Sequence, residues 1–130
     1  MKEIESLVNC IVDQAKHFLA DAGEFYPFGA SLGADGILTP LSVLMDDDFP
    51  DSVEVLKILE REVPKRLTDK NAVAVAIGVD VIRSTEGPTK KSDAIQIKIL
   101  TAEGESAIYY VDYVEGDGNL VFGPLIKEDC

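Results

Sequence analysis

Residues 72–82 have the sequence AVAVAIGVDVI, an almost unbroken apolar run. Such a run predicts a central β-strand that is covered on both faces. Because side chains alternate along a strand, one face carries valines and Ile77. The other face, called the alanine face below, consists of Ala72, Ala74, Ala76 and Gly78. Its lack of bulk would let a helix approach closely, so we expect the helices on this face.

Downstream of this run, extended segments continue to the end of the chain. Isoleucines alternate with polar residues over 95–99, which predicts a strand with one buried and one wetter face. Two further extended segments cover 106–114 and 120–124. The turn signals at 101–105 and 115–119 separate these segments. The second half therefore reads as four strands joined by loops and turns.

Upstream of the run, two segments have helical periodicity. Apolar residues recur at helical spacing over 4–22, and Gly23 stands where a glycine commonly ends a helix. A second helical pattern covers 53–63, with Asp51 as its expected capping residue. Pro64 interrupts that pattern, so we expect the helix to end or kink there.

Between the two helices, the stretch EFYPFGASLGADG at 24–36 predicts a hairpin with the extended run at 37–44. Pro27 and Pro40 must each lie at a strand end, a bulge or an unpaired edge, because proline lacks the backbone donor. At least two of the three aromatic side chains should pack against the first helix. Tyr26 is the ring that we expect to point outward.

Together these elements predict one α+β domain over residues 1–130, in the order α-β-β-α-β-β-β-β. Helices and strands are grouped, so the sheet should be mainly antiparallel and curved, with about six strands. We expect the two helices on one face of this sheet. The other face would then meet solvent or a partner, and a homodimer could form through it or through an edge strand.

Charge narrows the classes of partner. The chain has 12 Lys and Arg against 24 Asp and Glu, a net charge of -12. This balance opposes binding to nucleic-acid phosphates and to anionic membranes, and it favours a partner with a basic surface. No apolar run approaches the ~18 residues of a membrane span, and the N-terminus lacks a secretory apolar region. We therefore expect a cytoplasmic protein.

Reactive motifs are not recognisable in the sequence. Cys10 and the only histidine, His17, are separated by about 10.5 Å along the first helix, too far to act as nucleophile and base. The acidic run at 46–48 lacks the alternation of a calcium-binding EF-hand loop. The lysines at 90–91 do not follow a phosphate-binding glycine pattern. We expect no catalytic residue, cofactor or metal ion.

Three segments resemble those of small bacterial proteins of uncharacterised function. They are FYPFG at 25–29, AVAI at 74–77 with the following Asp80-Val81, and SDAIQI at 92–97. The resemblance spans most of the chain and implies a bacterial, cytoplasmic origin without implying an activity. The element order is also similar to the roadblock and profilin-like arrangement, which is an analogy of fold alone.

Two functional hypotheses remain open. The first is a small, acidic, non-catalytic binding protein, similar to an immunity or adaptor protein, that contacts a basic protein surface or itself. Because tyrosine and opposite charge suit interfaces, its contact residues would be Tyr26, Asp46, Asp47, Asp48, Tyr109, Tyr110 and Tyr113. The alternative is an enzyme or small-ligand sensor whose pocket uses Tyr26, Asp80, Asp112 or the aspartates at 46–48.

Overall fold

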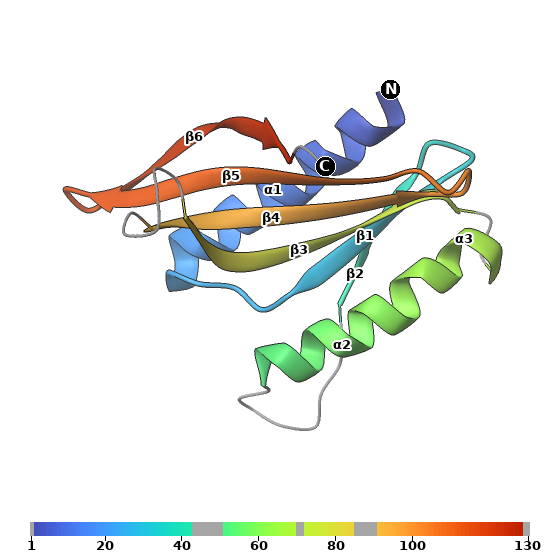
Figure 1. The fold of residues 1–130 in the computed structure, drawn as a ribbon, viewed down its shortest axis with the longest axis horizontal. Coiled ribbons are helices and arrows are strands. Elements are labelled where there is room, and N and C mark those ends of the chain that lie inside the picture. Colours follow the sequence, from blue (N-terminus) through green and yellow to red (C-terminus); the bar gives the residue numbers. More distant parts are fainter. Residues whose placement is uncertain (1, 43–50, 70–71, 85–90, 129–130) are drawn as a thin grey trace.

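The computed structural model describes residues 2–42, 51–69, 72–84 and 91–128 (Figure 1). Within these ranges the chain forms an open antiparallel sheet of six strands in the order β2-β1-β3-β4-β5-β6. The elements are α1 (Lys2–Ala22), β1 (Phe28–Gly33), β2 (Leu38–Leu41), α2 (Ser52–Glu62), the 3-10 helix η1 (Val63–Lys65), α3 (Arg66–Asp69), β3 (Ala72–Ser84), β4 (Lys91–Thr101), β5 (Ser106–Gly116) and β6 (Asn119–Lys127). The predicted fold class and element order are confirmed.

Helix α1 forms and ends as its periodicity predicts. Leu7, Ile11 and Ala15 lie on its apolar stripe and are fully buried. Gly23 adopts a φ of 77°, and its N–H donates to the carbonyl oxygen of Leu19 at 2.9 Å. A left-handed residue at this position closes the last helical turn. The chain can therefore leave the helix sharply and turn back toward β1.

Strand β3 lies between β1 and β4, and α1 packs directly on its alanine face. Ala74 and Ala76 are buried in the same cluster as Leu7 and Ile11. A Cβ atom on Gly78 would lie only 2.7 Å from Cγ2 of Ile11. The helix therefore approaches the strand backbone at a point where a side chain would not fit.

Helix α2 covers the opposite face of β3. Asp51 caps it, because its Oδ1 accepts a hydrogen bond from the N–H of Val53 at 2.9 Å. The buried side chains of α2 and η1 then pack on a face that we call the valine face. The cluster contains Val55, Leu59 and Val63 against Val75, Ile77 and Val79. It also contains Ala72, which the alternation wrongly predicted for the alanine face; the register of β1 and β3 shifts next to this residue. As expected, α2 stops just before Pro64, which lies in η1.

The prediction that both helices lie on one face of the sheet is therefore wrong. α1 packs on the alanine face of β3 and α2 on the valine face, so the two helices flank the strand (Figure 1). The prediction rested on the small side chains of one face, but the other face is equally apolar and also gains from leaving water. The expectation of a strand covered on both faces is confirmed.

The remaining strands extend the sheet beyond α2. On the side of the valine face, the sheet presents polar groups, among them an ion pair between Arg83 of β3 and Asp112 of β5 with an Nε–Oδ1 distance of 2.6 Å. Pro40 and Pro124 both lie in edge strands, β2 and β6, where a missing donor is tolerated. Among the described residues, no helix is long and apolar enough to cross a membrane.

Candidate functional site

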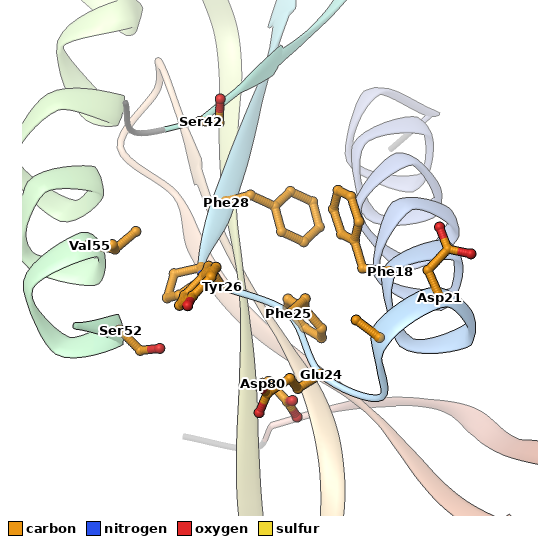
Figure 2. Close-up of a pocket in the computed structure, with 12 residues that line it drawn as sticks. Phe18, Asp21, Glu24, Phe25, Tyr26, Phe28, Ser42, Ser52, Val55 and Asp80 are labelled. Carbon is orange, nitrogen blue, oxygen red and sulfur yellow. The ribbon is translucent and has the colours of Figure 1, made fainter. Parts of the chain in front are cut away.

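A pocket of about 580 Å³ opens where the two helices come closest to the start of β1 (Figure 2). The end of α1, the connection at 24–27, the first residue of β1, the middle of β3 and the start of α2 all contribute to it. A volume of this size suits a small molecule or one side chain of a partner. Its walls come from segments far apart in the sequence, so only the folded chain forms it.

One wall of the pocket is aromatic. The rings of Phe18 and Phe28 meet edge to face with a centroid distance of 5.4 Å, and Phe25 and Phe28 meet similarly at 5.6 Å. Phe25 and Phe28 are buried, as the sequence predicted for two of the three rings in this stretch. Tyr26 is 46% exposed and lines the pocket on the side of α2. Tyr26, the ring that was expected to point outward, therefore lines the pocket.

Asp80 forms the polar end of the pocket. The hydroxyl of Tyr113 donates a hydrogen bond of 2.6 Å to its Oδ1, and the backbone N–H of Phe25 donates as well. Burial raises the pKa of the Asp80 carboxyl, and the neighbouring carboxylates of Asp93 and Glu24 add to this, whereas the two hydrogen bonds act in the opposite direction. Asp80 is thus held in a site that disfavours its charge.

Tyr113 is the fixed donor to this carboxyl. Burial raises the pKa of its phenol above the ordinary value, and the hydrogen bond to Asp80 raises it further. The hydroxyl therefore stays protonated and donates. Asp80 and Tyr113 come from β3 and β5, on either side of β4, and the phenol reaches across the intervening strand. This contact ties the polar end of the pocket to the core.

Two further carboxylates line the pocket. Glu24 and Asp80 are drawn next to each other in Figure 2, whereas Asp21 projects away from the aromatic rings, and its Oδ2 lies 3.4 Å from Nε2 of the exposed His17. Of the described residues that line the pocket, none is a lysine, arginine or histidine. The negative charge of Asp80 and Glu24 therefore has no cationic partner among these lining residues.

The predicted interaction residues do not form one surface. Tyr113 is only 7% exposed and belongs to the core. The prediction that it contacts a partner is therefore wrong. Tyr109 is partly buried against the same core. Tyr110 faces the other side of the sheet, where its ring lies under Arg83 and its hydroxyl accepts from Gln96. Side chains alternate between the two faces of a strand, so the consecutive residues Tyr109 and Tyr110 of β5 point to opposite faces of the sheet. The aspartates Asp46, Asp47 and Asp48 lie outside the described residues.

The predicted carboxylate and tyrosine pocket is assembled only in part. Tyr26 and Asp80 share it, whereas Asp112 lies on the opposite face of the sheet, paired with Arg83. Sequence reasoning missed Phe18 and Glu24 as lining residues. Phe18 lies within the helical apolar pattern of α1, which marks it as a packing residue, and Glu24 follows the glycine that ends the helix. For Glu24, this position beside the glycine turn is the only local signal.

The described residues hold few groups for reaction chemistry. No cluster of three His, Cys, Asp or Glu in the described ranges could hold a metal ion. His17 is exposed, and Cys10 is half-buried, with its sulfur accepting a hydrogen bond from Gln14 rather than facing solvent freely. Comparison of the chain with protein-family models, curated proteins and solved structures gave no match. The pocket itself therefore carries the functional argument.

Proposed function

We propose that this chain is a non-catalytic binding protein that recognises a positively charged segment of a protein partner at the pocket beside Asp80, as an immunity or adaptor protein would. One observation carries the proposal: the pocket joins an aromatic wall to the carboxylates of Asp80 and Glu24, and the described part of its lining contains no basic residue. A cationic group with an apolar stem complements both features.

Electrostatics supports this choice at two ranges. At long range, a net charge of -12 attracts a basic partner and speeds its encounter with the chain. At short range, burial makes the charge on Asp80 unfavourable, the carboxylates of Asp93 and Glu24 add to this, and a bound cation would offset that repulsion. An anionic or purely apolar partner would gain neither contribution.

The test is a titration of isotope-labelled protein with a short peptide that alternates arginine and lysine with leucine, followed by amide NMR. We expect shifts at the pocket residues and none with a peptide that has glutamate at the basic positions. Glu24→Gln should weaken binding by about three- to fivefold, the effect of one exposed charge pair. Glu103→Gln, which removes the same charge from the exposed β4–β5 turn, is the matched control.

The proposal fails if the basic peptide shifts no pocket amide. It also fails if Glu24→Gln and Glu103→Gln weaken binding equally, since the attraction would then be general and independent of the pocket. Equal binding of the acidic peptide would contradict it as well.

A small-ligand sensor is the second candidate, and the size of the pocket favours it. A volume of about 580 Å³ lies within the range of small-molecule sites. Benzylammonium, which has a ring and one positive charge, is a suitable probe of this class. Binding of free benzylammonium at least as tight as that of the basic peptide would favour the sensor over the protein-binding function.

A further inference from the structure

We infer that the group which enters this pocket is an arginine side chain of the partner, with its guanidinium at Asp80 and Glu24 and its methylene stem along the aromatic wall. The inference rests on the proposed function and names the anchor residue that would carry it.

The polar end of the pocket is suited to a planar, multidentate cation. Asp80 comes from β3 and Glu24 from the connection after α1; both line the pocket, and the charge of Glu24 acts on the Asp80 carboxyl. A guanidinium has five donors in a rigid fork and can bond two carboxylates at once. The third lining carboxylate, Asp21, already pairs with His17 and projects away from this end.

The walls of the pocket are suited to the rest of an arginine side chain. Phe25 and Phe28 are fixed by edge-to-face contacts with their neighbours and present a rigid apolar surface to a methylene stem. Tyr26 is half exposed and is free to stack on a guanidinium plane that passes it. A side chain with an apolar stem and a flat charged head matches this order of surfaces.

Lysine matches the pocket less well. Its ammonium is a compact and strongly hydrated charge that loses more on entering a partly apolar site and cannot stack on a ring. An aromatic or aliphatic side chain would fill the volume but would cover Asp80 and Glu24 without giving them a donor, which costs free energy. An acidic or phosphorylated side chain would meet two like charges.

The experiment compares three capped peptides that differ only in a central arginine, lysine or citrulline, by amide NMR titration of the whole chain. Arginine should bind about two- to fivefold more tightly than lysine, in line with cation–π contacts at partly exposed sites. Citrulline keeps the shape and hydrogen-bonding head but has no charge, so it should lose about tenfold or more.

Two variants and one control test whether the preference for arginine arises in the pocket. Glu24→Gln should reduce the affinity for arginine and leave the fold intact, because Glu24 is exposed. Tyr26→Leu keeps an apolar side chain but removes the ring, and should bring the arginine and lysine peptides to similar affinities. Ile37→Ala removes exposed apolar surface from the β1–β2 turn, away from the pocket, and should change neither affinity.

The outcomes separate this inference from the proposed function. If lysine binds as tightly as arginine and both depend on Glu24, the arginine anchor is wrong and the basic partner stands. If citrulline binds as well as arginine, the charge of the head is irrelevant and the anchor is wrong. If none of the three capped peptides binds while the peptide that alternates arginine and lysine with leucine does, only the arginine anchor is wrong. If that alternating peptide does not bind either, both proposals are wrong.

Discussion

The two faces of β3 are both buried under a helix, but they achieve this in opposite ways. On the alanine face, small residues let α1 approach until Ile11 touches the backbone at Gly78. On the valine face, Val75, Ile77 and Val79 fill the space themselves, and the shorter α2 rests on them. One face is packed by the helix side chains and the other by the strand side chains.

This difference sets where each face tolerates change. Close approach of backbone and side chain leaves no slack, since protein interiors are packed as densely as organic crystals. On the valine face, partly buried neighbours such as Leu56 and Leu41 can move into the space that a substitution leaves. The alanine face should therefore be the more sensitive to substitution in either direction.

The largest expected effect comes from truncating Ile11. Ile11→Ala should lower the free energy of unfolding by an amount near the upper end of the ~2–5 kcal/mol range for buried aliphatic residues, because Gly78 opposite has no side chain to fill the cavity. Leu59→Ala on the valine face should cost less within the same range. Urea unfolding followed by circular dichroism measures both. A larger loss for Leu59→Ala would reverse the comparison.

A smaller effect is expected from adding one methyl group to the same contact. Gly78→Ala should cost about 1–3 kcal/mol, because the new Cβ would lie 2.7 Å from Cγ2 of Ile11 and 3.3 Å from the ring of Phe28. The double variant with Ile11→Ala should cost less than the sum of the single changes, since the colliding methyl group is then gone.

A matched glycine provides the control for this overpacking. Gly123→Ala in β6 would place its Cβ at 3.6 Å from the nearest atom, an ordinary contact, so its unfolding free energy should change little. Strict additivity of Gly78→Ala and Ile11→Ala, or equal costs at Gly78 and Gly123, would show that close helix approach does not limit the alanine face.

Local signals in the sequence were enough to predict most of the elements. The glycine after α1, the capping aspartate of α2, the apolar run of β3 and the turns between β4, β5 and β6 are each determined within a few residues. The side of the sheet on which α2 packs is not determined by such local signals. Both faces of β3 are apolar, and a two-sided apolar strand accepts a helix on either face, so only the tertiary structure decides.

The pocket was hidden from the sequence for a related reason. Glu24 and Asp80 lie far apart in the chain, and only the fold brings both to the lining of one pocket. Tyr109 and Tyr113 lie on the same side of β5, as alternation along a strand requires, but alternation alone does not tell which side is the inner one. Tyr113 can lie in the core because its hydroxyl donates to the half-buried carboxyl of Asp80. The sequence does not show that these two residues meet.

The smallest expected effect concerns the charge that the alanine face holds at its end. Because burial raises the pKa of Asp80 above the ordinary value of an aspartate, the folded chain binds a proton there that the unfolded chain has released over the pH range between the two pKa values. The free energy of unfolding should therefore fall as pH rises through that range. Asp80→Asn keeps an oxygen acceptor for Tyr113 but cannot ionise, so its contribution should not vary with pH.

Urea unfolding of both proteins from pH 3.5 to 8 tests this sign. The difference between the wild-type chain and Asp80→Asn should shift against the wild type as pH rises and should level off once Asp80 is ionised in both states. Parallel curves for Asp80→Asn would mean that the carboxyl ionises as easily in the fold as in water. A bound cation would then have no unfavourable charge at Asp80 to offset. The attraction of the pocket for a cation would depend on the aromatic wall and on the net negative charge of the chain alone.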